Sequence, residues 1–288
     1  MAPHSKKRAP HIALILALLL TLPVLVAVSV HAASMYIFGT DNPSLTSPTE
    51  STYIDNLLNW INNAAKYGTH GVSSTVVDTG VTSAQILSAA SSASGPALLF
   101  FVGHGYYETI TVATGTYTMY YIVDNNEQQV YDEDIYEQTA VGRFHLVFLH
   151  SCYQGHVIGG VFKIGDSYYH YGMPQAWLHT SFLSSDGYGS PDYSGYVFIG
   201  WRNVAPFLSS DILGTDDTLY RFIGNFYDSL FGYYTVAAPS VNKALDYASQ
   251  KVFGPGILFG ESPLYDGFVL GGIQTKMVVY GDGSYDGW

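Results

Sequence analysis

Two almost continuous apolar runs constrain the fold of this chain more than any other feature. The first, ALLFFV at residues 97–102, leads into His104 and Gly105, and the second, FHLVFL at residues 144–149, leads into Cys152. Strands that are apolar along their whole length are typical of parallel sheets covered by helices on both faces. The sequence therefore predicts an α/β fold in which both runs are inner strands.

The alternation of strands and helices predicts a doubly wound sheet. Strands are expected at residues 35–38, 72–77, 97–102, 144–149, 195–201 and 276–280, and β-hairpins at residues 109–123 and 157–171. Helices are expected at residues 48–68, 82–93, 132–142, 174–183, 215–231 and 240–253. Ser47 with Glu50, and Thr82 with Gln85, are expected to form capping boxes. The predicted fold class is a three-layer α/β sandwich with a mostly parallel central sheet and inserted β-hairpins.

The N-terminal segment, residues 1–33, is expected to be a signal peptide. A basic stretch at residues 6–8 precedes an apolar run at residues 12–30, and small residues stand before Ser34, which is the pattern of a signal-peptidase site. The run also approaches the ~20 residues that span a bilayer, so an uncleaved N-terminal membrane anchor is the alternative. We expect a secreted or cell-surface protein with one domain at residues 34–288, and membrane contact only if the segment is not cleaved.

The chain is acidic and has one cysteine. Its 288 residues include 23 Asp and Glu against 11 Lys and Arg, for a formal net charge of −12. Nucleic-acid partners need clustered Lys and Arg on phosphates, so none is expected. Cys152 has no second cysteine with which to form an internal disulfide. An unpaired thiol in an exported protein is either buried and inert or kept for its chemistry.

His104 and Cys152 each follow a predicted parallel strand, and ligands bind at the carboxyl ends of such strands. A thiol is mostly protonated at neutral pH, and a neighbouring imidazole that takes its proton produces the nucleophilic thiolate. The backbone N–H groups of Gly105 and Cys152 are expected to form an oxyanion hole. The sequence therefore predicts a cysteine peptidase with His104 as base and Cys152 as nucleophile.

These motifs resemble the caspase, gingipain and legumain group of cysteine peptidases (clan CD, the caspase-hemoglobinase fold). The resemblance rests on His104-Gly105 and Ser151-Cys152, each at the end of an apolar strand, and on the strand at residues 196–201 and the closing segment at residues 278–282. It implies a caspase-like fold and an exported endopeptidase. Such an enzyme would hydrolyse peptide bonds of a peptide or protein substrate through a Cys-His dyad and a thioester acyl-enzyme.

The resemblance also implies further site residues. Asp41 or Asn42, after the first strand, stands where legumain-like members orient the catalytic histidine. Trp201 and Arg202 resemble the Trp-Arg segment of caspases, in which the arginine binds an acidic P1 side chain in the S1 pocket. The opposite preference, for a basic P1 residue, would need an acidic pocket, for which the candidates near that edge are Asp186, Asp192 and Asp211.

Several alternatives stay open. His156 or His170 could replace His104 as the base, and the histidines show no recognisable zinc spacing. No cofactor is expected, although calcium is possible at Asp282, Ser284 and Asp286. The alternative function is a non-catalytic extracellular binding or assembly module on the same scaffold, with the Tyr-rich hairpins as its contacts.

Overall fold

A computed structural model describes residues 33–93, 95–113, 115–157, 162–164, 168–170, 172–180, 183, 187–189, 194–212, 214–238 and 240–284. The predicted signal segment therefore lies outside the described residues, except for Ala33. Within the described ranges, no helix combines the length and the apolar character that a membrane crossing requires.

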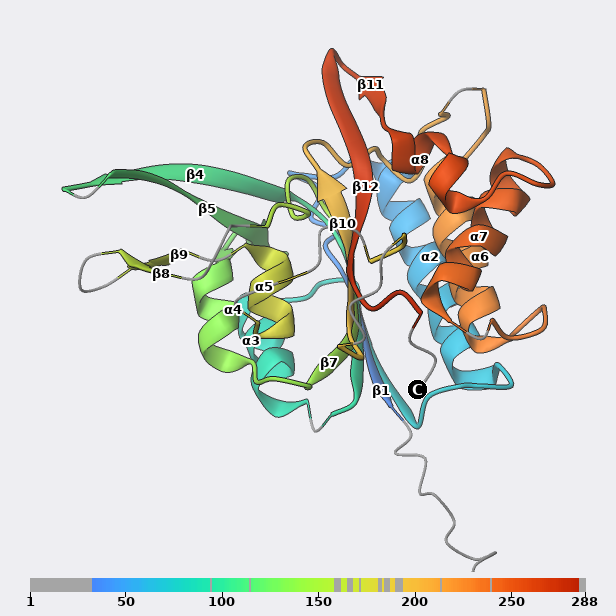
Figure 1. Ribbon diagram of the computed structural model, residues 1–288, viewed down its shortest axis with the longest axis horizontal. Helices are drawn as coiled ribbons and strands as arrows, with labels where there is room; N and C mark the ends of the chain where they lie inside the picture. Colours follow the sequence, from blue (N-terminus) through green and yellow to red (C-terminus); the bar gives the residue numbers. More distant parts are fainter. Residues whose placement is uncertain are drawn as a thin grey trace, which may run out of the picture. The chain divides into compact units, whose positions relative to one another are not determined.

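The centre of the molecule is a seven-stranded sheet in the order β11-β12-β10-β7-β3-β1-β2 (Figure 1). Its strands are β1 (Ser34–Gly39), β2 (Ser74–Asp78), β3 (Ala97–Val102), β7 (Phe144–His150), β10 (Val197–Arg202), β11 (Phe268–Leu270) and β12 (Ile273–Gly281). The strands from β2 to β10 pair in parallel, whereas β12 is antiparallel to both β10 and β11. The expected mostly parallel sheet is confirmed.

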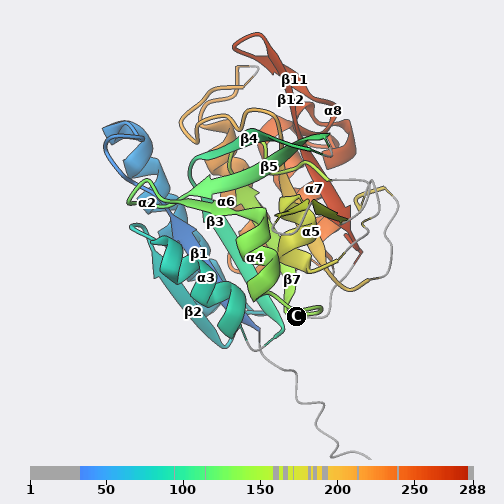
Figure 2. The ribbon, with the colours of Figure 1, turned by 90° about the vertical axis from the view of Figure 1, so that its left-hand side faces the viewer.

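Helices cover both faces of the sheet (Figures 1 and 2). On one face lie α2 (Pro48–Tyr67), α6 (Thr218–Phe231) and α7 (Val241–Phe253). On the other face lie α3 (Ser83–Ser92), α4 (Asp132–Gln138) and α5 (Met173–Leu178), which is shorter than expected. Two short helical segments, Phe259–Glu261 and α8 (Pro263–Asp266), precede β11. The protein is a mixed α/β fold whose sheet is enclosed between two helical layers.

The helix starts follow the local sequence, with one correction. Thr82 and Gln85 form the expected capping box at α3. Ser47 caps α2 by accepting from the Glu50 N–H at 3.2 Å, but the Glu50 side chain does not complete a box. Its carboxylate instead accepts from the Ser209 hydroxyl at 2.8 Å, because the contact with a distant loop offers it stronger partners than the exposed cap.

Two small sheets are inserted between the main strands. The first comprises β4 (Gly105–Val112), β5 (Gly115–Val123) and β6 (Gln129–Tyr131), and the second comprises β8 (Phe162–Ile164) and β9 (Tyr168–His170). The first hairpin begins at Gly105 rather than at Thr109, because β4 continues directly from the end of β3. This early start is what carries the hairpin over the carboxyl edge of the sheet.

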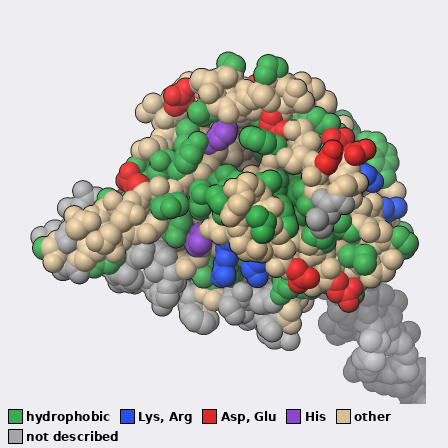
Figure 3. All heavy atoms as spheres, turned by 90° about the horizontal axis from the view of Figure 1, so that it is seen from above, with side chains coloured by type: hydrophobic (Ala, Val, Ile, Leu, Met, Phe, Trp, Pro, Cys, Tyr) green, Lys and Arg blue, Asp and Glu red, His purple; other side chains and the backbone are tan. Residues whose placement is uncertain are grey.

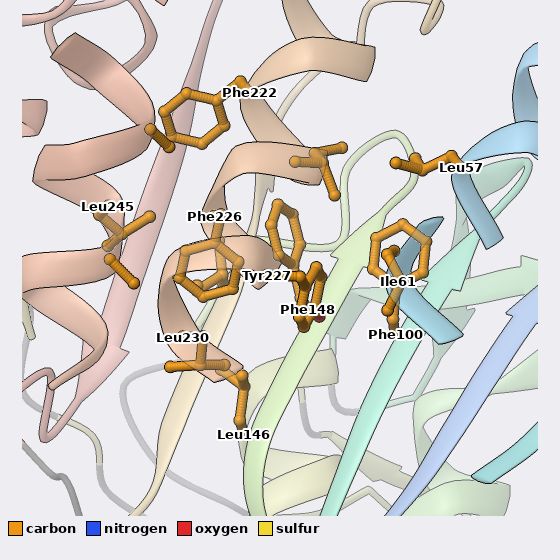
Figure 4. Close-up of a cluster of buried hydrophobic side chains, with 14 of the residues drawn as sticks. Leu57, Ile61, Phe100, Leu146, Phe148, Phe222, Phe226, Tyr227, Leu230 and Leu245 are labelled. Carbon is orange, nitrogen blue, oxygen red and sulfur yellow. The ribbon is translucent and has the colours of Figure 1, made fainter. Parts of the chain in front are cut away.

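Aromatic packing joins the sheet to α6 (Figure 4). Phe148 of β7 is fully buried, and its ring centroid lies 5.7 Å from that of Phe100 and 5.9 Å from that of Phe226. Both contacts are edge-on, a favoured geometry for aromatic pairs. Phe148 therefore connects two strands of the sheet with the helical layer above them.

Replacing Phe148 by Ala should lower the free energy of unfolding by about 3–5 kcal/mol, because it removes buried apolar surface and leaves a cavity. Urea denaturation followed by circular dichroism measures this loss. The control is Val269→Ala at a side chain that is 65% exposed, for which a change below about 0.5 kcal/mol is expected. A loss of less than about 1 kcal/mol for Phe148→Ala would contradict the packing described.

Candidate active site

The two motifs leave the sheet side by side. Strands β3 and β7 are parallel neighbours, and their register places Val102 opposite His150. The Gly103 N–H donates to the His150 carbonyl at 3.2 Å, just beyond the last pair. His104 and Cys152 each follow by two residues, so both emerge at the same carboxyl edge. In Figure 3, uncharged side chains cover most of the middle of this side, and the carboxylates lie mainly nearer its outline.

Gly105 brings the first hairpin against the loop that carries the cysteine. A Cβ atom on Gly105 would lie 2.3 Å from the Ser151 Oγ and 2.5 Å from the Cys152 carbonyl oxygen. Gln154 then connects the two segments, because its side-chain amide donates to the Cys152 carbonyl at 2.7 Å and to the Tyr121 carbonyl at 3.2 Å. Only glycine permits this close approach of the two backbones.

The thiol of Cys152 faces the segment that follows β10. The Ala205 N–H donates to the Cys152 Sγ at 3.3 Å, and the Tyr153 N–H donates to the Asn203 carbonyl at 2.6 Å. Cys152 is half-buried, so its sulfur is neither fully exposed nor sealed inside the core. The cysteine loop and the segment after β10 thus form one continuous rim.

His104 lies on the same rim. Its half-buried ring hydrogen-bonds the backbone of Leu45, and the Tyr106 ring stacks beside it at a centroid distance of 6.3 Å and an interplanar angle of 12°. Burial raises the pKa of Tyr106, and the charge of the Cys152 thiolate raises it further, so this phenol lies near both side chains. Tyr106 was not singled out in the sequence, where it is one of 25 tyrosines.

Asp41 and Asn42 are not the partners of the His104 ring. The Asn42 side chain donates to the Asn125 carbonyl at 2.8 Å and accepts from the Ser44 N–H at 2.9 Å, while the Asp41 N–H donates to the Asn125 Oδ1 at 3.1 Å. These bonds shape the turn after β1. The turn contacts the His104 ring through the backbone of Leu45. A main-chain group, rather than the Asp41 or Asn42 side chain, therefore orients the imidazole.

A cavity of about 50 Å³ lies beside the His104 ring, between α2 and the segment after β10. It is lined by His104, Glu50, His150 and Pro206, among others. Glu50 is buried, and its carboxylate accepts from the Leu208 N–H at 2.5 Å as well as from Ser209. One sequence signal pointed to the burial of Glu50, because this residue lies four positions before Ile54 and so on the apolar face of α2.

His150 also lines the cavity. Its Nδ1 accepts from the Trp201 indole N–H at 3.1 Å, and its Nε2 lies 3.0 Å from the Pro206 carbonyl, to which it donates. Complete burial lowers the pKa of His150 to about 4. Both ring nitrogens are therefore occupied, and His150 is a structural neutral imidazole.

Trp201 does not line an S1 pocket. Its side chain is fully buried and packs in the core beneath α6 and α7. Neighbouring residues on a strand point to opposite faces, and Arg202 accordingly is exposed at the end of β10. The Arg202 guanidinium donates to the Tyr280 hydroxyl at 3.1 Å. The Gly155 N–H donates to the Trp201 carbonyl at 2.8 Å, so Arg202 flanks the cysteine loop.

The other candidate residues lie elsewhere or outside the described ranges. His156 stacks on Tyr120 with a centroid distance of 5.3 Å, and burial together with the positive charge of Arg202 lowers its pKa. Asp211 accepts from the Asp217 N–H at 3.0 Å before α6. The candidates that lie outside the described ranges are Asp186, Asp192, Asp286 and the side chain of His170.

The described residues contain no group of three His, Cys, Asp or Glu side chains placed to hold a metal ion. Of the three residues considered for calcium, Asp282 uses its carboxylate to accept from the Ser284 N–H at 3.1 Å. This is a local turn contact, and it gives no support to a cation at this position.

Burial is the main cause of the pKa shifts of His104 and Cys152. It lowers the pKa of His104, although the hydrogen bond to Leu45 and the Glu50 carboxylate act in the opposite direction. It raises the pKa of the Cys152 thiol, and the Ala205 N–H opposes this shift. Both shifts favour the uncharged forms. The resting pair is therefore a neutral thiol and a neutral imidazole rather than an ion pair.

The Gly105 N–H is not used by the hairpin. The Val123 N–H donates to the His104 carbonyl at 3.0 Å, so His104 and Val123 form a hydrogen-bonded pair, and the next pair, Gly105 and Ile122, is a non-hydrogen-bonded one. Because β4 is an edge strand, the Gly105 N–H points away from β5, toward the open side of the hairpin.

No family model matches this sequence, and a search of curated proteins finds no significant match.

The raised pKa of Cys152 predicts slow alkylation at neutral pH. Because thiolate is the reactive form, the rate with iodoacetamide should rise with pH and reach half its maximum at a higher pH than the rate of an exposed thiol does. N-acetylcysteine serves as the exposed reference thiol, and mass spectrometry follows the modification. His104→Ala should leave the rate at pH 7 unchanged. A rate plateau below pH 7 that disappears in His104→Ala would instead demonstrate a thiolate–imidazolium pair.

Proposed function

We propose that this protein is an exported cysteine endopeptidase with a caspase-like scaffold. The observation that carries the proposal is that the His104 imidazole and the Cys152 thiol leave neighbouring parallel strands at one rim, both against the segment of residues 205–207. A thiol and an imidazole that emerge at one edge of a sheet are the two groups that nucleophilic catalysis by cysteine requires. Export is inferred from the sequence of residues 1–33.

In the proposed reaction, the Cys152 sulfur attacks the carbonyl carbon of the substrate peptide bond while His104 takes the thiol proton. The oxyanion that forms accepts hydrogen bonds from the Gly105 and Cys152 N–H groups. His104 then gives the proton to the leaving amine, and a thioester to Cys152 remains. Water hydrolyses the thioester with His104 again as base, which restores the free thiol and releases the new carboxyl end.

The neutral resting pair fits this sequence of steps. An imidazole of lowered pKa is unprotonated at neutral pH and can accept a proton when a substrate displaces water from the rim. The Glu50 carboxylate, which acts on His104 across the cavity, would stabilise the imidazolium that forms during attack. His104 therefore needs no carboxylate in direct contact to serve as base and then as acid.

Cleavage of a peptide library, read by mass spectrometry, tests the proposal. The wild type should cut defined peptides, and both Cys152→Ala and His104→Ala should lower kcat/KM by about 10³-fold or more, because each removes one member of the dyad. The matched control is His70→Ala at an exposed histidine, for which activity should be unchanged. Cleavage that persists in Cys152→Ala, or no cleavage of any library peptide by the wild type, would favour the non-catalytic binding module.

We propose that Arg202 selects an acidic P1 side chain. Its exposed guanidinium flanks the cysteine loop and has one hydrogen bond to the neutral Tyr280 hydroxyl, which leaves donors for a carboxylate. A bidentate arginine–carboxylate pair is stronger and more directional than a neutral hydrogen bond.

Arg202→Ala should lower kcat/KM for peptides with Asp at P1 by about 10- to 100-fold, which corresponds to roughly 1.4–2.7 kcal/mol, and should affect peptides with Ala at P1 much less. Arg221→Ala, at an exposed arginine on α6, is the control. Preferred cleavage after Lys or Arg would contradict the assignment and support the acidic pocket instead.

A further inference from the structure

A second pocket lies on the outer side of α2, away from the His104 and Cys152 rim. Its volume is about 280 Å³, close to the lower end of the range of roughly 300–1,000 Å³ that small-ligand sites occupy. The residues of α2 that line it are Asn56, Asn59, Trp60 and Asn63. Tyr220 of α6, and Tyr233 and Tyr234 after α6, complete the lining. Every lining side chain is therefore an amide or an aromatic ring, and none is charged.

The three asparagines form one stripe. Positions 56, 59 and 63 are three and four residues apart, so they share a face of the helix, and all three are exposed. Among the described residues, none of these amides has a hydrogen-bond partner within the protein, whereas Asn62 next to them accepts from Thr75 at 2.8 Å. Each amide offers two donors and one acceptor oxygen. The stripe thus presents several unused donors and acceptors to the pocket.

The aromatic side is held in place by contacts from behind. The Trp60 indole N–H donates to the Asp228 carboxylate at 2.9 Å, and the Trp60 ring packs against Gly224, where a Cβ would lie 2.5 Å from it. Trp60 and Tyr220 are in edge-on contact at a centroid distance of 5.4 Å. These rings are ordered before any ligand arrives, which reduces the entropy that binding must overcome.

The outer wall consists of two adjoining tyrosines. The rings of Tyr233 and Tyr234 lie 4.0 Å apart between centroids, and their hydroxyls are within hydrogen-bond distance at 3.2 Å. Tyr234 is 74% exposed, so it contributes little to the core. A tyrosine presents an apolar ring together with a polar hydroxyl, which suits a ligand that has both apolar and polar surfaces.

The pocket chemistry distinguishes among ligand classes. A quaternary ammonium ion would use the aromatic rings but would leave the three amides without partners. An anionic ligand would meet no cation in the lining and a chain of net charge −12. A pyranose ring has C–H groups on its faces, which pack on aromatic rings, and hydroxyls on its rim, each of which donates and accepts. We propose that this pocket binds a neutral oligosaccharide through Trp60 and the tyrosines on the sugar face and through the asparagine stripe on its hydroxyls.

Binding is tested on the full chain with the neutral hexasaccharides of cellulose, starch, chitin and mannan as probes. Saturation-transfer NMR detects binding, and titration of each probe that binds gives Kd. Tyr234→Ala should weaken binding at least about tenfold, equivalent to about 1.4 kcal/mol, because it removes one aromatic wall. Asn59→Ala should weaken it by about threefold to tenfold through the loss of hydroxyl contacts.

The matched control is Tyr67→Ala, which removes a tyrosine that is 70% exposed on the same helix but outside the pocket lining; its Kd should equal that of the wild type. Urea denaturation verifies that all three variants fold. Binding of none of the four probes, or equal binding by the wild type, Tyr234→Ala and Asn59→Ala, would overturn the proposal. Binding of choline at concentrations at which no hexasaccharide binds would overturn it in favour of an aromatic cage for cations. The outcome does not depend on peptidase activity.

Discussion

The site depends on the register between β3 and β7, and that register depends on one extra residue. Ala97 pairs with Phe144, but Leu98 pairs with Leu146, so the register skips His145. A bulge of this kind reverses the faces to which the following residues point. Phe144 accordingly packs in the core cluster beneath α3, α4 and α5, whereas Leu146 packs in the cluster beneath α2, α6 and α7.

The reversal continues through the rest of β7 to the site. It places Phe148 and then His150 on the α2 and α6 side of the sheet, and the Cys152 thiol meets Ala205 next to that side. Strict alternation from Phe144 would have turned the same residues toward α3, α4 and α5. The meeting of the cysteine loop with the His104 cavity therefore follows from a local irregularity five residues before the end of the strand.

Much of this arrangement follows from sequence. The apolar runs of β3 and β7, the Thr82 capping box and the two motifs at the carboxyl edge are local signals, and each determines its own element. The bulge at His145 gives no local signal, because FHLVFL is apolar in either register. For the same reason the direction of His150 could not be inferred. The Glu50 contact with residues 208 and 209 joins segments more than 150 residues apart in sequence, a distance over which no periodicity gives information.

Glycine stands on both sides of His104, at positions where neighbouring atoms come too close to the backbone for a Cβ atom. Gly105 was expected to supply an N–H group, and the structure adds a second reason for it, since a Cβ would collide with Ser151 and Cys152. Gly103 has a similar restriction, because a Cβ there would lie 2.2 Å from the Thr40 Oγ1. Gly103 and Gly105 are thus both required by close packing. The position of the imidazole is consequently set by the backbone around it.

The segment of residues 203–209 is held by contacts from three elements, α2, β7 and β12, and this explains how a loop can present a fixed donor to the thiol. Glu50 of α2 accepts from the Leu208 and Ser209 N–H groups, and His150 of β7 bonds the Pro206 carbonyl. The Thr275 hydroxyl donates to the Val204 carbonyl at 2.6 Å. Buried polar groups stay buried only when they are hydrogen-bonded, so the Glu50 carboxylate and the segment stabilise each other. The fold itself therefore orients the Ala205 N–H toward the Cys152 sulfur, and the electrostatic stabilisation it gives to a thiolate requires no rearrangement of the loop.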